Sequence, residues 1–164
     1  RYGAGIAVCP WSNAVLRNGR ADLALLRRLG VTVGAGTDSV APGGGFDLFR
    51  ETRLAALACA LTPREMLRLI TVDAAAALGL AGAGTLEPGG WGDVCAVSLA
   101  APALAAAPDP EEVLALSATP ADVVCTVVAG TPVYRDGAWP GVDAAAERAE
   151  LAEAARVARR AAAA

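Results

Sequence analysis

Leu29-Gly-Val-Thr-Val-Gly-Ala-Gly-Thr-Asp-Ser-Val-Ala-Pro-Gly-Gly-Gly45 is the most informative stretch of the chain. Residues 31–33 are all β-branched, which favours a buried strand over a helix. At Asp38 this strand gives way to a loop that contains one proline and three glycines. A carboxylate at the C-terminal end of a strand, beneath a loop, is a usual position for a catalytic group in α/β enzymes. The alternative is an ordinary Asp-Ser turn, in which both side chains bond their own backbone.

Composition narrows the classes of function. The chain has 164 residues, enough for one domain or slightly more, and is 55% hydrophobic but only 4% aromatic, which predicts a helix-rich core of Leu and Val. The net charge is −3 and the arginines are scattered, so we expect no nucleic-acid partner. Charge, glycine or proline interrupts each apolar run, so we expect no membrane span. Four widely spaced cysteines favour neither a disulfide framework nor a zinc cluster, and predict a reducing cytoplasm.

Two further classes of site are disfavoured. The chain contains no histidine, so it cannot by itself build the imidazole-rich centre of most metallohydrolases. A nucleophilic Ser12 or Ser39 would therefore also lack a histidine base. Residues 34–39 begin like a dinucleotide-binding motif, but serine stands at its sixth position where glycine is required, which argues against a nucleotide-binding βαβ domain.

The first part of the chain predicts a parallel βαβ unit. An apolar strand at 6–9 is followed by an amphipathic helix at 21–29, with Asp22 near its start and Gly30 as its stop, and then by the strand at 31–33. Ser12 and Asn13 lie after the first strand, as a helix cap or as a polar pair at the strand end.

Helices are predicted next. Residues 46–61 form a helix whose buried stripe would comprise Phe46, Phe49, Leu54, Leu57 and Leu61. Its acids at positions 47 and 51 suit the helix dipole, and either would be the second carboxylate if Asp38 took part in paired acid/base chemistry. A capping box at 62–65 opens another helix, and a short helix covers 73–78.

The predicted secondary structure changes from helices to short strands and turns after residue 80. Residues 86–139 predict a small β-rich unit with strands at 94–99, 123–128 and 133–134. An alanine- and proline-rich linker is expected at 100–110, followed by one or two helical turns at 111–116. Residues 143–164 form a charged, alanine-rich surface helix or frayed tail.

Several of these stretches, in this order, resemble the closing segments of the amidohydrolase superfamily, in its cytosine deaminase/chlorohydrolase-like branch. The resemblance runs from about residue 5 to about residue 140. The segments that carry it are Cys9-Pro-Trp-Ser-Asn13, Gly36-Thr-Asp-Ser39, Phe46-Asp-Leu-Phe-Arg-Glu-Thr-Arg53, Thr71–Leu80, Gly84–Gly89 with Gly92-Asp-Val94, and Val127–Gly137.

The resemblance implies an α/β fold, namely the C-terminal part of a metal-bearing (β/α)8 TIM-like barrel together with part of a small β-sandwich. Residues 1–80 would supply the last barrel strands and helices, residues 81–140 the C-terminal part of the sandwich, and residues 141–164 a helical tail. Family metal ligands from a His-x-His strand and a later strand would lie before Arg1, so the chain is interpreted as a fragment of a longer enzyme.

The resemblance also implies roles for individual residues. Asp38 matches an aspartate that binds a divalent metal, Zn or Fe, and serves as general base. Ser12, Asn13 and Ser39 match or adjoin positions that border the substrate pocket. Trp11 departs from the small or basic residue that is frequent at its position, and residues 90–93 depart from the usual Lys-x-Ala-Asp pattern of the sandwich.

The implied function is hydrolysis of a non-peptide carbon–nitrogen bond in a small molecule, with deamination of an aminated N-heterocycle or nucleoside as the expected reaction. A cytoplasmic enzyme is expected, and both a monomer and a homo-oligomer stay open. The alternative is a catalytically inactive binding or scaffold module that retains this half of the fold.

Overall fold

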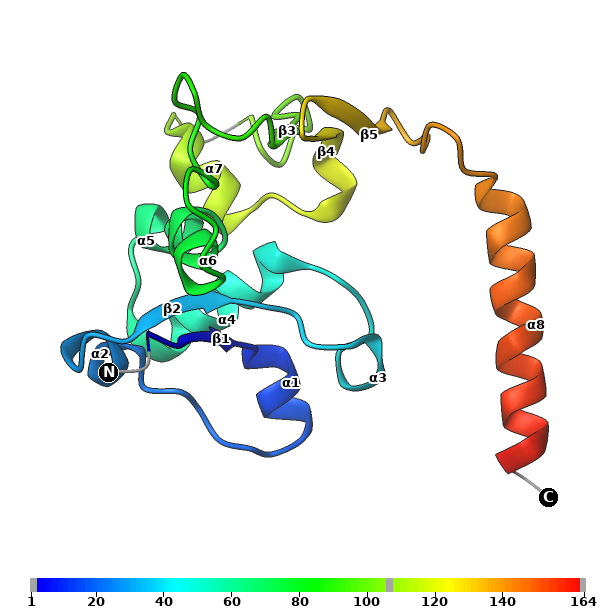
Figure 1. Ribbon diagram of the computed structural model, residues 1–164, viewed down its shortest axis with the longest axis horizontal. Coiled ribbons are helices and arrows are strands. Elements are labelled where there is room, and N and C mark those ends of the chain that lie inside the picture. Colours follow the sequence, from blue (N-terminus) through cyan, green and yellow to red (C-terminus); the bar gives the residue numbers. More distant parts are fainter. Residues whose placement is uncertain (1–2, 106–107, 163–164) are drawn as a thin grey trace.

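The computed structural model describes residues 3–105 and 108–162 of the chain (Figure 1). Its elements are, in chain order, β1 (Gly5–Val8), α1 (Pro10–Val15), α2 (Leu23–Arg28), β2 (Thr32–Ala35), α3 (Val40–Gly43), α4 (Leu48–Cys59), α5 (Pro63–Leu69), α6 (Val72–Ala77), β3 (Val94–Val97), α7 (Pro110–Leu116), the 3-10 turn η1 (Pro120–Asp122), β4 (Val123–Val128), β5 (Thr131–Arg135) and α8 (Ala144–Ala162). Residues 106–107 of the expected linker and 163–164 of the expected terminal helix lie outside the described residues.

The parallel βαβ unit is confirmed. Strands β1 and β2 pair in parallel, with Val8 opposite Ala35. Helix α2 begins as predicted, because the Asp22 side chain accepts a hydrogen bond from the Leu25 N–H at 2.8 Å. The chain leaves this helix through Gly30, whose φ of 72° is a conformation that glycine adopts without strain.

The expectation that Ser12 or Asn13 caps a helix is wrong. Both residues lie inside α1, whose N-cap is Cys9 and whose first residue is Pro10. Proline suits this position, because the first N–H of a helix has no intrahelical partner and the ring presets φ. The helix therefore begins directly after β1.

The segment expected as a loop after Asp38 contains a helical turn. Residues 40–43 form α3, with Ser39 as N-cap and Gly44 as a left-handed C-cap at φ 62°. Pro42 is tolerated as the third residue of this turn, because the first four N–H groups of a helix have no carbonyl partner within it.

The stripe predicted at 46–61 is wrong at two of its five positions, and the other three are half-buried. Phe46 and Leu57 are 71% and 84% exposed, whereas the buried residues of α4 are Glu51, Thr52 and Ala55. The face of α4 that packs toward β2, α1 and α5 carries these smaller or hydrogen-bonded side chains. Thr52 and Ala55 are small, and Glu51 can be buried because its carboxylate is hydrogen-bonded to the Trp11 N–H and paired with Arg50.

Helices α5 and α6 follow the prediction closely. The capping box is formed, with Thr62 accepting from the Glu65 N–H and Glu65 accepting from the Thr62 N–H. Helix α6 packs directly on β1 and β2 (Figure 1). A Cβ atom at Gly34 would lie 2.6 Å from the Ala74 Cα, so only glycine allows this approach.

The core joins these elements into one body. Its main cluster comprises Val8, Leu23, Val33, Ala35, Ala55 and Leu69. Helix α7 adds a second buried group against α5 and α4, and the Arg53 guanidinium donates to the Ala118 carbonyl oxygen at 2.8 Å. The expected linker also contributes, because Leu104 is only 4% exposed.

The β-rich unit forms a three-stranded antiparallel sheet in the order β3-β4-β5. Strand β3 ends at Val97, two residues before the predicted end, and the Ser98 N–H donates instead to the Asp122 carbonyl. The Ala129 N–H donates to the Asp93 carboxylate at 2.7 Å, which ties the start of β3 to the β4–β5 turn.

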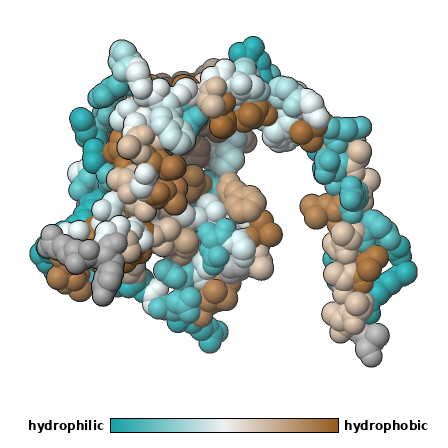
Figure 2. Space-filling model, viewed as in Figure 1, coloured by the Kyte–Doolittle hydropathy of each residue, from teal (hydrophilic) through white to brown (hydrophobic). Residues whose placement is uncertain are grey.

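Helix α8 stands apart from the rest of the molecule (Figure 1). None of its described residues is buried, and Leu151 is 71% exposed. Hydrophobic residues are visible along it in Figure 2, interspersed with hydrophilic ones. Within the described part of the chain, no helix combines the length and apolar character needed to cross a membrane.

Candidate active site

Asp38 lies just beyond the C-terminal end of β2. One residue past β2, the Gly36 N–H donates to the Val8 carbonyl at 2.8 Å. The segments that leave β1 and β2 therefore stay adjacent up to the start of α1. Asp38 is exposed and has a φ of 59°, in the left-handed region. Aspartate is tolerated there because its short side chain can bond the adjacent backbone. The end of β2 is thus shaped to present one carboxylate to solvent.

Both carboxylate oxygens of Asp38 accept a hydrogen bond. The Ser12 hydroxyl donates to Oδ2 at 2.6 Å, and the Ser39 N–H donates to Oδ1 at 2.7 Å. These two bonds, the Ser12 hydroxyl first, lower the pKa of Asp38 from its ordinary value, because they stabilise the charged form. Asp38 therefore carries its negative charge at neutral pH.

A charged carboxylate at this position can bind a cation or accept a proton. Each oxygen of Asp38 uses one lone-pair direction for its hydrogen bond and keeps others for a further partner. Among residues 3–105 and 108–162, no group of three or more His, Cys, Asp or Glu side chains is arranged to hold a metal ion. Asp38 thus fits as one oxygen ligand of a divalent metal, and this part of the chain assembles no complete ligand set around it.

The predicted substrate-contacting residues lie in three different environments. Ser12 is 2% exposed, and its hydroxyl proton is directed to Asp38. Ser39 is exposed and contributes its backbone N–H to the same carboxylate. Asn13 lies on a different face of α1, where its side chain lines a cavity of about 150 Å³.

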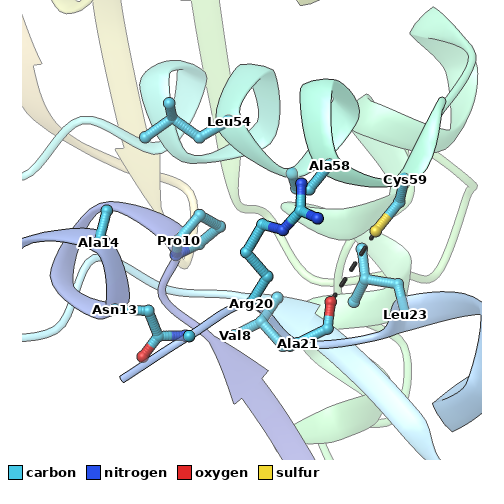
Figure 3. A pocket seen from close by; sticks show the side chains of 12 residues that line it. Val8, Pro10, Asn13, Ala14, Arg20, Ala21, Leu23, Leu54, Ala58 and Cys59 are labelled. Carbon is cyan, nitrogen blue, oxygen red and sulfur yellow. Dashed lines mark hydrogen bonds between the residues drawn. The ribbon is translucent and has the colours of Figure 1, made fainter. Parts of the chain in front are cut away.

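The cavity beside Asn13 lies between α1 and α4 and is mainly apolar (Figure 3). The Arg20 side chain extends along it, and the Cys59 thiol lies 3.9 Å from the Ala21 carbonyl oxygen at the end away from Asn13. The structure therefore brings Ser12 and Ser39 to Asp38 and directs Asn13 into this cavity. The roles of Ser12, Asn13 and Ser39 in substrate binding remain predictions.

A buried ionic cluster lies behind α1, and the sequence reasoning missed its arrangement. Glu51 is fully buried; its Oε2 accepts the Trp11 N–H at 2.8 Å and its Oε1 lies 3.2 Å from Arg50 Nη2. The Arg50 guanidinium lies 4.2 Å from the centre of the Trp11 ring. The only sequence signal was an acid one turn after the Asp47 cap, which equally suits a helix-dipole partner.

The thiol of Cys9 lies near enough to Asp38 and Glu51 to be influenced by both negative charges. Burial raises the pKa of the Cys9 thiol, and the negative charges of Asp38 and Glu51 raise it further. The thiol therefore stays protonated at neutral pH. The side chain therefore serves as a small, half-buried group rather than as a thiolate.

Comparison with known proteins gives a consistent result. The model of the amidohydrolase family matches residues 1–133. A 5-methylthioadenosine/S-adenosylhomocysteine deaminase of Halobacterium salinarum is 36% identical over 159 residues, which are 92% of this chain and 37% of that protein. A deaminase of the same name from Symbiobacterium thermophilum is 35% identical over 144 residues, which are 82% of this chain and 33% of that protein. The chain thus spans about a third of the length of these relatives.

Solved structures of a deaminase and a chlorohydrolase also superpose on this chain. An adenosine deaminase from Xanthomonas campestris with bound zinc superposes with a TM-score of 0.90 at 28% identity, covering 95% of this chain and 38% of that one. An atrazine chlorohydrolase mutant from Arthrobacter aurescens, complexed with zinc and atraton, superposes with a TM-score of 0.82 at 26% identity, covering 91% and 35%.

Proposed function

The chain belongs to the amidohydrolase family, and from this premise we propose that it forms part of a metal-dependent hydrolase that removes an amino group from an aminated nitrogen heterocycle or nucleoside. The relatives named as deaminases of adenine-containing compounds support this class of substrate. Because the chain spans about a third of their length, the activity is proposed for the longer protein.

The proposed architecture follows the same reasoning. Strands β1 and β2, with the helices that pack on them, would be two strands of a (β/α)8 barrel formed with further residues, and residues 81–140 would contribute to a small β-sandwich. The parallel pairing of β1 and β2 supports the first assignment, since barrel strands are all parallel. The antiparallel sheet β3-β4-β5 supports the second.

Asp38 carries the proposal. It is a charged, exposed carboxylate at the C-terminal end of a parallel strand, which is where such barrels place their reacting groups. It would supply one ligand to a divalent metal, zinc or iron, with the other ligands from the rest of the protein. When bound, such a metal makes a water molecule acidic enough to ionise near neutral pH.

Asp38 would also move the proton. A carboxylate beside the attacking water can accept its proton, and the same carboxyl group can then donate that proton to the departing amine. The water oxygen would bond to the ring carbon, and the carbon–nitrogen bond would break to release ammonia. The hydrogen bonds from Ser12 and Ser39 keep the carboxylate charged and ready for the first of these steps.

The test is Asp38→Asn in the zinc-loaded, complete protein, with ammonia release measured on 5-methylthioadenosine, S-adenosylhomocysteine and adenosine. Loss of the base is expected to lower kcat by about 10³-fold. Asp136→Asn is the matched control. Asp136 is also exposed and also has a left-handed backbone conformation, at φ 48°, but it lies in the turn after β5, outside the candidate site. Equal turnover of Asp38→Asn and the unsubstituted protein would refute the assignment. Zinc binding without turnover on any of these compounds would favour an inactive binding module.

A further inference from the structure

We infer that Ser12 is a positioning residue: its hydroxyl fixes the orientation in which Asp38 presents its carboxylate to the metal. This inference rests on the proposed role of Asp38 as a metal ligand. It gives Ser12 a different role from the substrate contact that its position in the sequence suggests, and it extends the site inward to a buried acid on α4.

The first argument is the geometry of the two hydrogen bonds on Asp38. The terminal torsion of an aspartate side chain is broad when nothing holds the carboxylate. Here Ser12 holds Oδ2 at 2.6 Å and the Ser39 N–H holds Oδ1 at 2.7 Å, so rotation about the Cβ–Cγ bond would break both contacts. Ser39 is adjacent in sequence and bonds through its backbone, which leaves Ser12 as the side chain from another element that sets the angle.

The second argument is burial. Ser12 is 2% exposed although Asp38 is exposed, so the hydroxyl reaches the carboxylate from the interior side. A serine hydroxyl has one proton to donate, and that proton is directed to Asp38. Ser12 thus has little solvent access, and its one donor is already used for Asp38.

The third argument is that Ser12 is itself held in place. The preceding residue, Trp11, donates its N–H to the fully buried Glu51 at 2.8 Å, which fixes the first turn of α1. Arg50 lies against both partners, 3.2 Å from the Glu51 carboxylate and 4.2 Å from the Trp11 ring centre. A continuous series of contacts therefore runs from Glu51 through Trp11 and Ser12 to Asp38.

Outer partners of this kind determine how well a metal ligand binds. Residues that hydrogen-bond a ligating side chain set its direction, and their loss costs about 10- to 100-fold in metal affinity or activity. Ser12 occupies that place relative to Asp38. Its removal should therefore weaken the metal site without changing the ligand itself.

The experiment uses the complete protein as Ser12→Ala, Ser12→Thr, Asp38→Ala and the Ser12→Ala/Asp38→Ala double variant. Zinc affinity is measured on metal-stripped protein by competition with a chelating indicator, and kcat and KM are measured after zinc loading. We expect Ser12→Ala to weaken zinc binding by about 10- to 100-fold and to lower kcat with little change in KM. Ser12→Thr, which keeps the hydroxyl, should recover most of both.

The double variant tests whether Ser12 acts through Asp38. With Asp38 already removed, Ser12→Ala should cause no further loss of zinc affinity, because its partner is absent. Thr52→Val is the matched control: Thr52 is 1% exposed and donates its hydroxyl to the Phe49 carbonyl at 2.9 Å, away from Asp38. It should lower the thermal midpoint while leaving zinc affinity unchanged.

Two results would overturn the inference: zinc affinity of Ser12→Ala within about twofold of the unsubstituted protein, or equal effects of Ser12→Ala with and without Asp38. A different result would overturn the proposed function instead. If Asp38→Ala retained both zinc affinity and turnover, Asp38 would not be a ligand at all.

Discussion

Replacing Glu51 by glutamine should destabilise the protein far more than its small chemical change suggests. Glu51 is fully buried and makes two contacts, with the Trp11 N–H at 2.8 Å and with Arg50 at 3.2 Å. Breaking a buried ion pair from one side costs about 3–5 kcal/mol. Glutamine keeps one oxygen for the Trp11 N–H, and the Arg50 side chain is 23% exposed, so water recovers part of the loss. We therefore expect a loss of about 2–3 kcal/mol in the free energy of unfolding.

The assay is urea denaturation of both proteins, followed by tryptophan fluorescence at neutral pH. Asp47→Asn is the matched control, because Asp47 begins the same helix and its carboxylate accepts the Arg50 N–H at 3.0 Å as a cap. Asparagine caps helices about as well as aspartate, so a change below about 0.5 kcal/mol is expected. Similar losses for the two variants, or a loss below about 1 kcal/mol for Glu51→Gln, would show that the buried pair contributes little.

Two further predictions concern close packing and pH. Gly34→Ala should lower the free energy of unfolding by about 1–3 kcal/mol, because the new Cβ would lie 2.6 Å from the Ala74 Cα. In Gly36→Ala the new Cβ would lie 3.4 Å from its nearest neighbour, so this control should be nearly neutral. Equal effects of the two substitutions in thermal denaturation would refute this packing argument. Hydrogen bonds from Thr62, first from its N–H and then from its hydroxyl, lower the pKa of Glu65 below its ordinary 4.5. Their contribution is therefore complete above that value and is lost as pH falls through the lowered pKa. Glu65→Gln should accordingly be less stable than the unsubstituted protein at pH 7, by less than about 1 kcal/mol because the Glu65 side chain is 42% exposed. The difference should disappear once the pH has fallen below the lowered pKa of Glu65, and a difference that persists in strong acid would contradict the assignment.

The parts of the fold that were predictable are those with local signals. The β-branched run at 31–33, the Asp22 cap with its Gly30 stop, and the Thr62–Glu65 capping box each act over a few residues. Such signals do not depend on distant partners. The βαβ unit that they predict is therefore present in the structure, with β1 and β2 in parallel.

The rest depends on contacts between distant segments. The burial of Glu51 follows from a bond to Trp11, which lies 40 residues earlier in the chain. Leu57 lies on the exposed side of α4, and the spacing of apolar residues alone does not say which side of a helix meets its neighbours. Asp38 could be singled out because it ends a strand, but the role of Ser12 required the 2.6 Å contact across 26 residues.

The detached helix α8 has a consequence for how unfolding is observed. Its 19 residues pack against nothing that buries them, and such a helix is only marginally stable in water. The three tryptophans, at positions 11, 91 and 139, all lie outside it. Circular dichroism at helical wavelengths will therefore include a gradual, non-cooperative loss from α8, whereas fluorescence will follow the packed body alone. The two midpoints should differ, and a single two-state fit to the dichroism would underestimate the cooperativity of the core.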